Sequence, residues 1–358
     1  MLPGPPRRHK DSGSPLLLST LRQPCVLVSI LITVSFFLYF QLMHHKNSGS
    51  VSTVTPLDNF QHLHSHPVVN EEFMKSTRFV RSENAIVTSM YNDAFAVPIV
   101  TLGHSLNRVK SKARRIVFYL PGRVSERALC IATASGFEPY AVERIAAPGD
   151  GVHGHFADQF TKLSIWKFHE LGVKAVVYLD ADILVRRNFD ELFALPFNFA
   201  AVPDIYVGEP GFTIGFNAGV LFVRTSATVF HDLVSQINTA HYRHWEAEQA
   251  YLNVFYGPDV ARLPYIYGGN QAIKKRNPEL WEALQPELRL IHYSLVKPFW
   301  RGVYNETGVE DMHENVLRRA EDWGGLWRDE IMEWGDAWRE TEETYGLALS
   351  RCAWKHGH

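Results

Sequence analysis

The sequence predicts an α/β protein in which helices cover both faces of a mostly parallel sheet. From about residue 84 onward, short apolar runs alternate with segments of helical spacing. The runs are continuously apolar, as is typical of parallel strands buried on both faces. One of them, residues 175–179, leads directly into Asp180 and Asp182. Ligands of such sheets bind beyond the carboxyl ends of the strands, so a site is expected at this edge.

Each element of this alternation has a local signal. Pro98 stands where a first helical turn tolerates proline. Pro121 and Gly122 end a strand, and Gly136 and Gly172 each follow a helical segment. In chain order, the predicted strands are residues 85–88, 115–120, 140–145 and 175–179, and the predicted helices are residues 97–106, 125–134 and 160–171.

The N-terminal region contains a candidate membrane segment. Residues 25–43 are 19 residues without a charge, about the length that crosses a bilayer as a helix. A cleaved signal peptide is the alternative, but its apolar core is usually about 7–15 residues long and precedes a small-residue cleavage site. Here His44 and His45 follow instead. Basic residues before the segment outnumber those after it, which predicts a cytosolic N-terminus and a luminal remainder.

These features divide the chain into five regions. The short anchor and the Ser-, His-, Thr- and Pro-containing stem favour a Golgi membrane and single-pass type II topology. The sequon at Asn305 would then face the lumen and be open to glycosylation. The expected regions are a cytosolic tail (1–24), a transmembrane anchor (25–43), a stem (44–80), the α/β domain (81–300) and a C-terminal helical extension (301–358).

Charge and cysteine content exclude other classes. The net charge of −2 gives no basic face for broad nucleic-acid binding. Of the three cysteines, Cys25 begins the apolar segment. One luminal disulfide, Cys130–Cys352, is possible, although the sequence does not favour it. The protein is therefore not a disulfide scaffold.

The two aspartates after the fourth strand indicate a metal site. Side chains alternate along a strand, so Asp180 and Asp182 lie on the same side. Two close carboxylates repel each other unless a cation lies between them. Oxygen ligands of this kind suit Mg²⁺ or Mn²⁺, with substrate phosphates completing the coordination shell. Surface loops often contain Asp-x-Asp, but apolar residues on both sides of this pair favour a metal–diphosphate site.

Three further motifs have a functional and a structural interpretation. His292 could bind the metal and Lys297 could pair with a phosphate; a core histidine and a surface lysine are the alternative. Asn217 could bind sugar hydroxyls where Gly219 allows close backbone approach, or it could be a turn residue. Glu248 and Gln249 could meet a sugar from a helix start, or could lie on a solvated helix face.

Four tryptophans in the C-terminal region fall on one helical face. Their steps of four, seven and four residues suit either an aromatic platform for a sugar or a helix packed on the core. The packed helix is the favoured interpretation. The residues are Trp323, Trp327, Trp334 and Trp338.

These segments together resemble glycosyltransferase family 8, the family of glycogenin and galactinol synthase. The resemblance spans residues 84–300 in matching order. Its segments are Asn84-Ala85-Ile86-Val87-Thr88, Asn92-Asp93-Ala94-Phe95, Leu102-Gly103-His104-Ser105-Leu106, Phe160-Thr161-Lys162-Leu163, Leu179-Asp180-Ala181-Asp182, Phe216-Asn217-Ala218-Gly219-Val220, Glu248-Gln249, and His292 with Lys297-Pro298.

The resemblance implies a GT-A fold and retaining transfer of a hexose or related sugar from a UDP-sugar, with Mn²⁺ or alternatively Mg²⁺. The acceptor would be a glycan, glycolipid or glycoprotein. The implied metal ligands are Asp180, Asp182 and His292. Lys162 and Lys297 would serve the diphosphate or position the donor, Thr88 and Phe95 the uridine, and Asn217, Glu248 and Gln249 the sugars.

The chain departs from the family pattern at two points. Ser294 and Leu295 occupy a stretch where the family usually has a glycine between the histidine and the lysine. Glu248 stands where the family often has a shorter aspartate.

Other classes remain as alternatives. A phosphatase with an aspartate nucleophile usually carries its Asp-x-Asp after the first strand, not the fourth. A nucleotidyltransferase would need a Gly-rich basic loop at the first strand, which is absent. A catalytically inactive luminal binding or scaffold protein on the same fold is the main alternative to an enzyme.

Overall fold

The computed structural model describes residues 28, 32–36, 38–39, 66–69, 71–149, 152, 154–205, 215–301 and 311–354. The chain divides into two units, Met1–Val54 and Thr55–His358. Most of the predicted anchor, the whole tail, much of the stem and Asn305 lie outside the described residues. Within the described part of the chain, none of the helices combines the length and hydropathy needed to cross a membrane.

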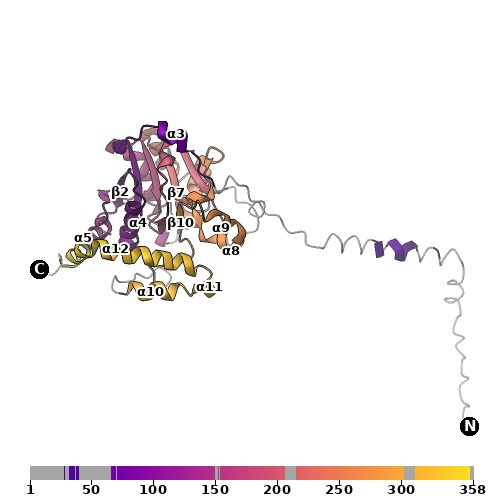
Figure 1. Cartoon of the computed structure of the whole chain (residues 1–358). Helices are drawn as coiled ribbons and strands as arrows, with labels where there is room; N and C mark the ends of the chain where they lie inside the picture. Colours follow the sequence, from indigo (N-terminus) through magenta and orange to yellow (C-terminus); the bar gives the residue numbers. More distant parts are fainter. Residues whose placement is uncertain are drawn as a thin grey trace, which may run out of the picture. The chain divides into compact units, whose positions relative to one another are not determined.

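The second unit is built on a mostly parallel sheet (Figure 1), as the sequence predicts. Among the described residues the sheet has seven strands in the order β3-β2-β1-β4-β7-β6-β8. Only β7 runs antiparallel to its two neighbours, β4 and β6. The strands are β1 (Asn84–Met90), β2 (Arg114–Tyr119), β3 (Glu138–Ala141), β4 (Ala175–Leu179), β6 (Phe199–Pro203), β7 (Phe216–Arg224) and β8 (Ala261–Arg262).

A smaller sheet begins with the strand that follows the aspartates. Its described strands have the order β5-β10-β9, with β5 (Ile183–Val185) antiparallel to β10 (Leu290–His292) and β9 (Gly269–Asn270) parallel to β10. The register places His292 opposite Ile183. This pairing brings two segments that are far apart in the sequence together beside the end of β4.

The predicted helices and strands are present, with two differences in detail. The segment Gln159–Leu171 (η5) is a 3₁₀ helix, closed by Gly172 in the left-handed conformation. The strand predicted at 140–145 begins and ends earlier, at Glu138 and Ala141, because β2 pairs with these residues. Helices α4 (Ala96–Arg108) and α5 (Glu126–Thr133) lie where they were expected. The remaining elements are α3 (Glu71–Ser76), α6 (Ala227–Gln236), α7 (Ala247–Tyr256), α8 (Gln271–Arg276), α9 (Pro278–Leu284), α10 (Met312–Arg319), α11 (Asp322–Gly325), α12 (Arg328–Trp354) and the short 3₁₀ turns η2 (Arg81–Glu83), η3 (Asp93–Phe95), η4 (Gly154–Phe156), η6 (Asp190–Ala194), η7 (His244–Glu246) and η8 (Tyr265–Tyr267).

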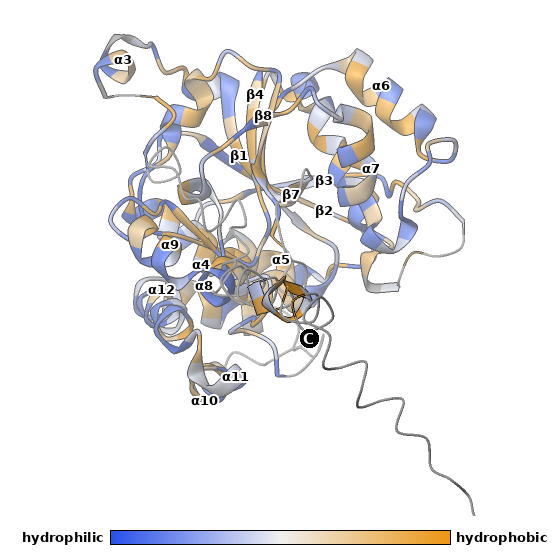
Figure 2. Cartoon of the chain, turned by 90° about the vertical axis from the view of Figure 1, so that its right-hand side faces the viewer, coloured by the Kyte–Doolittle hydropathy of each residue, from blue (hydrophilic) through white to orange (hydrophobic). Residues whose placement is uncertain are grey.

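The sheet separates two hydrophobic cores (Figure 2). Along β4, Val177 and Leu179 belong to one core, and Val176 and Tyr178 belong to the other. This alternation follows from the two-residue period of a strand. Burial on both faces explains why the strand sequences are continuously apolar.

The C-terminal helix α12 packs on α4 and α5. Trp334 and Trp338 are fully buried, whereas Trp323 is 57% exposed. Trp323 lies on α11 with a left-handed backbone, so the four tryptophans do not share one helical face as predicted. Trp334 and Trp338 belong to a packing face of α12. A disulfide joins Cys130 on α5 to Cys352 on α12. The sequence analysis did not favour this pair, and the structure shows it formed across a separation of 222 residues.

Candidate active site

The end of β4 brings the predicted metal ligands together. Asp180 N donates to Gly219 O at 2.8 Å, and Tyr293 N donates to Asp182 O at 2.9 Å. These bonds hold the turn after β4 between β7 and the residue after β10. One ligand atom each from Asp180, Asp182 and His292 lies within 4.8 Å of the others. His292 Nε2 is 3.3 Å from Asp182 Oδ1.

Gly219 makes this approach possible. A Cβ at this position would lie 2.5 Å from His292 Cε1 and 3.0 Å from Asp180 Oδ2. Both separations are shorter than ordinary van der Waals contact, so any larger residue would displace a site side chain. The backbone of β7 thus lies directly against the point where the three ligands converge.

Lys297 reaches the site although the family glycine is missing from its loop. Gln271 Oε1 accepts hydrogen bonds from Leu295 N at 2.9 Å and Val296 N at 2.7 Å, which fixes the loop. Lys297 Nζ pairs with Asp182 Oδ2. Burial alone would raise the pKa of Asp182, but the charges of Lys297 and His292 outweigh it and hold that pKa well below its usual value.

Lys162 lies beneath the site and not inside it. Its Nζ is 2.7 Å from Glu248 Oε1 and 3.2 Å from Asp180 Oδ1, and it donates to Ala218 O at 3.1 Å. Burial would lower the pKa of Lys162, but the two carboxylates outweigh it and raise that pKa. The buried lysine therefore stays charged and ties Glu248 to Asp180.

Tyr178 holds Asp180 from the other side. Burial raises the pKa of Tyr178 well above its usual value, so the hydroxyl stays protonated. It donates to Asp180 Oδ1 at 2.8 Å and lies 2.7 Å from Ser89 Oγ. The orientation of Asp180 is thus fixed before any ligand binds.

Asp204 links the residues predicted to face the sugars. Asn217 Nδ2 donates to Asp204 Oδ1 at 3.2 Å, and Gln249 Nε2 donates to Asp204 Oδ2 at 2.8 Å. Gln249 Oε1 in turn accepts from Ala218 N at 2.9 Å. Asn217 lies within β7 and not in a turn before it. Asp204 was not predicted, although this carboxylate also follows an apolar strand.

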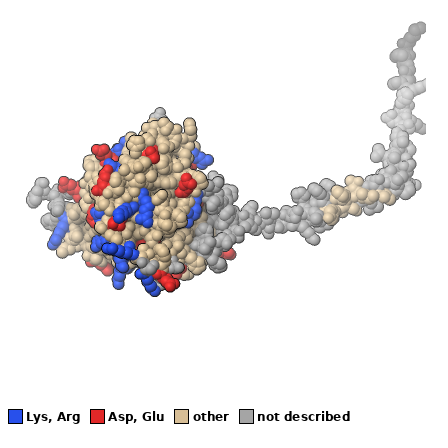
Figure 3. All heavy atoms as spheres, turned by 90° about the horizontal axis from the view of Figure 1, so that it is seen from above, with Lys and Arg blue, Asp and Glu red and all other residues tan. Residues whose placement is uncertain are grey.

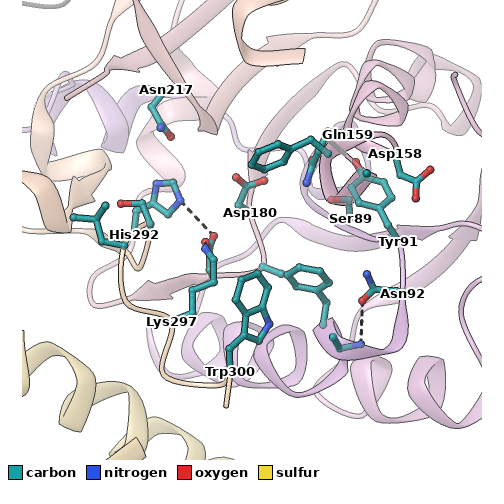
Figure 4. A pocket seen from close by; sticks show the side chains of 18 of the residues that line it. Ser89, Tyr91, Asn92, Asp158, Gln159, Asp180, Asn217, His292, Lys297 and Trp300 are labelled. Atoms are coloured by element: carbon teal, nitrogen blue, oxygen red, sulfur yellow. Dashed lines mark hydrogen bonds and ion pairs between the residues drawn. The ribbon is translucent and has the colours of Figure 1, made fainter. Parts of the chain in front are cut away.

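A cavity of about 790 Å³ opens over these groups (Figure 4). Thr88 is fully buried and does not line it, whereas Ser89 and Tyr91 do. Side chains alternate along a strand, so Thr88 faces away from its neighbours. Glu248 and Gln249 also stay outside the lining, as does Lys162. The predicted residues that do line the cavity are Phe95, Asp180, Asp182, Asn217, His292 and Lys297.

Several lining residues were not predicted. Trp300 meets Phe95 edge to face, with 6.0 Å between ring centroids. Asp158 pairs with Arg123, which also lines the cavity, and its Oδ1 is 2.5 Å from Arg144 Nε. Arg319 enters from α10. No local pattern marked these residues, because each reaches the cavity from its own loop or helix.

The donor set fits a divalent cation. Two carboxylates and an imidazole converge in the cavity, and Figure 4 shows Asp180, His292 and Lys297 directed into the same space. Asp182 Oδ1 is buried and accepts no well-formed hydrogen bond from any described residue. Asp180, Asp182 and His292 could therefore hold Mg²⁺ or Mn²⁺.

The fold and the site define a class of protein: an α/β protein with a carboxylate–imidazole cation site at the carboxyl end of its central sheet. Residues 155–302 match glycosyl transferase family 8. This segment of the chain is therefore similar to family 8 glycosyltransferases. The matched segment contains the aspartates, Asn217, His292 and Lys297, in agreement with the resemblance seen in the sequence.

Curated relatives extend the similarity beyond that segment. Galactinol synthase 1 of Ajuga reptans is 26% identical over 275 residues, which cover 68% of this chain and 80% of the relative. Galactinol synthase 6 of Arabidopsis thaliana is 28% identical over 290 residues, covering 71% and 83%. Glycogenin of Neurospora crassa is 24% identical over 246 residues, covering 66% of this chain and 34% of the relative.

Two solved structures have a looser likeness. The apo structure of the bifunctional glycosyltransferase WbbM is 17% identical, with a TM-score of 0.48, and covers 72% of this chain and 52% of its own. The galactosyltransferase LgtC in complex with donor and acceptor sugar analogs is 17% identical, with a TM-score of 0.44, covering 64% and 94%. These overlaps are too weak to carry an argument.

Proposed function

We propose that the protein is a retaining glycosyltransferase that moves a hexose or related sugar from a UDP-sugar to a glycan, glycolipid or glycoprotein acceptor. Mn²⁺ is the proposed metal, with Mg²⁺ as the alternative. The observation that carries this proposal is the meeting of Asp180, Asp182 and His292 beside Lys297 in one large cavity. Two carboxylates, an imidazole and a lysine suit a metal-bound diphosphate.

The residues around the cavity then take distinct roles. The cation, when bound, offsets negative charge on the departing diphosphate. Lys297 supplies a second positive charge to the same group, the kind of electrostatic stabilisation that contributes most to catalysis. Phe95 and Trp300 offer an apolar wall for the base. Retention follows either from a covalent intermediate or from same-face attack with the leaving phosphate as base.

The sugar side of the site is assigned to Asn217. It lines the cavity and is held by Asp204, which Gln249 also contacts. Gln249 and Glu248 act from behind, through Asp204 and Lys162 respectively. They are therefore proposed as positioning residues in the ligand-free enzyme.

We place the catalytic domain in the lumen of the Golgi, anchored by residues 25–43. The apolar segment and its charge asymmetry support a single-pass anchor. The Cys130–Cys352 disulfide supports an oxidising compartment, because disulfides are rare in the cytosol.

The test is UDP release by the full chain in detergent, with a panel of UDP-sugars and acceptors, with and without Mn²⁺. Asp182→Asn is the test variant, and Asp259→Asn, which changes an exposed aspartate, is the matched control. We expect release from one sugar that requires Mn²⁺, falls at least 100-fold in Asp182→Asn and is unchanged in Asp259→Asn. Folded protein that binds UDP without any turnover would favour the inactive binding protein instead.

A further inference from the structure

We infer that Arg319, from the C-terminal helix α10, is a second binding residue for the donor diphosphate. This inference rests on the proposed function and deepens it. Arg319 lines the same cavity as Asp180, Asp182, His292 and Lys297. It lies beyond residues 155–302, the segment that matches the family. The C-terminal extension would thus contribute directly to the donor site.

Helix α10 is fastened to the loop that carries Lys297. Asn315 Nδ2 donates to Pro298 O at 2.6 Å and to Trp300 O at 3.3 Å. Arg319 Nε donates to Lys297 O at 3.2 Å. The helix therefore sets its arginine directly behind the lysine already assigned to the diphosphate.

The contacts of Arg319 leave one guanidinium nitrogen, Nη2, for a ligand. Nη1 is 2.6 Å from Asp322 Oδ2, and the side chain is 15% exposed. No described residue pairs with Nη2 in the structure. Asp322 does not line the cavity, so it orients the arginine from outside. A planar guanidinium held in this way suits the oxygens of a phosphate.

The charge balance of the cavity calls for an anionic ligand. Its described lining carries three carboxylates (Asp158, Asp180, Asp182) and three basic side chains (Arg123, Lys297, Arg319). Arg123 is paired with Asp158, and Lys297 with Asp182. A divalent cation bound by the aspartates would give the cavity lining a net positive charge. The diphosphate of a nucleotide sugar carries about one negative charge on each phosphate, which matches this excess of positive charge.

A purely structural role is the competing explanation, because the bond to Lys297 O alone could clip α10 to the loop. The substitutions Arg319→Gln and Arg319→Lys separate the two roles. Glutamine removes the charge but keeps a donor at the position of Nε, which bonds Lys297 O, whereas lysine keeps the charge. Arg339→Gln is the matched control, since Arg339 is an exposed arginine on α12 that pairs with Asp336 and does not line the cavity.

The experiment measures binding of UDP and of uridine to each full-length variant by calorimetry with Mn²⁺ present, after melting curves establish equal folding. We expect Arg319→Gln to weaken UDP binding about tenfold or more and to leave uridine binding within about twofold. Arg319→Lys should recover part of the loss, and Arg339→Gln should match the wild type.

Each other outcome has a distinct meaning. Equal UDP affinity in Arg319→Gln and wild type would overturn the inference and leave the proposed function standing. Parallel loss of uridine and UDP binding would also overturn it, because Arg319 would then only support the loop. Wild-type protein that binds no UDP would instead overturn the proposed function, and this inference with it.

Discussion

Gly219 is the residue on which the metal site depends most directly. A Cβ on Gly219 would lie within 3.0 Å of His292 Cε1, Asn217 Oδ1 and Asp180 Oδ2. These neighbours sit on strands or on turns fixed by hydrogen bonds, so they have little freedom to move. A methyl group here would displace the metal-binding side chains before it disrupted the fold.

We therefore predict that Gly219→Ala weakens Mn²⁺ binding at least tenfold while the protein still folds. Calorimetric titration with Mn²⁺ measures this effect. Gly346→Ala is the control, because it lies within α12 and a Cβ there meets nothing within 4 Å. It should leave metal binding unchanged and raise the free energy of unfolding by about 0.5–1 kcal/mol. Unchanged metal affinity in Gly219→Ala would show that the three side chains do not bind the ion together.

The second prediction for a single residue concerns Lys162. Replacing it with Met leaves Glu248, which is 5% exposed, without its charged partner. We expect Lys162→Met to reduce the free energy of unfolding by about 3–5 kcal/mol, because removing one partner leaves a buried charge uncompensated. The Lys162→Met, Glu248→Leu double variant should lose much less than the sum of the single variants. Denaturant melts of the four proteins close this cycle; additive losses would mean that the ion pair contributes nothing.

The site residues differ in how far the sequence could identify them. Asp180 and Asp182 were predictable because they end a strand, and His292 and Lys297 because they follow another apolar segment. Thr88 was assigned to the uridine, yet Ser89 lines the cavity. In a strand buried on both faces, polarity does not say which of two adjacent residues faces the ligand. Arg319 and Asp158 could not be found, since only the tertiary fold brings their segments to the cavity.

At the scale of elements, helix α12 converts a periodic tryptophan pattern into packing. Trp334→Ala should reduce the free energy of unfolding by about 3–5 kcal/mol, since the side chain is fully buried. Trp323→Ala is the matched control and should cost much less, because Trp323 is 57% exposed. Denaturant melts measure both variants. Equal costs, with loss of acceptor binding in Trp323→Ala, would restore the sugar-platform interpretation.

The order of the elements was readable from the sequence, but their directions and long-range pairings were not. Strand β4 matches its prediction because glycine and the aspartates bound its apolar run. Nothing in residues 216–224 shows that β7 runs antiparallel, since direction depends on how the chain returns to the sheet. The Cys130–Cys352 pair likewise depends on α12 lying against α5, a contact that only the folded chain defines.

At the scale of the whole molecule, the distribution of charge agrees with a protein that binds one anionic ligand in a cavity. Figure 3 shows basic and acidic side chains interspersed over the face in view, without a continuous basic surface. This matches the net charge of −2 and the absence of a nucleic-acid signal in the sequence. The basic side chains proposed to bind the diphosphate, Lys297 and Arg319, line the cavity beside the aspartates.

The compartment of this domain is the last prediction. If residues 25–43 insert with the N-terminus in the cytosol, the domain reaches the lumen, where the sequon at Asn305 meets the glycosylation machinery and Cys130 can join Cys352. Full-length chain made in the presence of microsomes should then resist added protease and shift on glycosidase treatment, and Asn305→Gln should resist protease without the shift. Both cysteines should be blocked to alkylation until a reductant is added. Protease-sensitive chain with two free thiols would place the domain in the cytosol, because neither the disulfide nor the glycan can form there. The two readouts are independent, since protection reports topology and the thiols report redox environment, so agreement between them would fix the compartment.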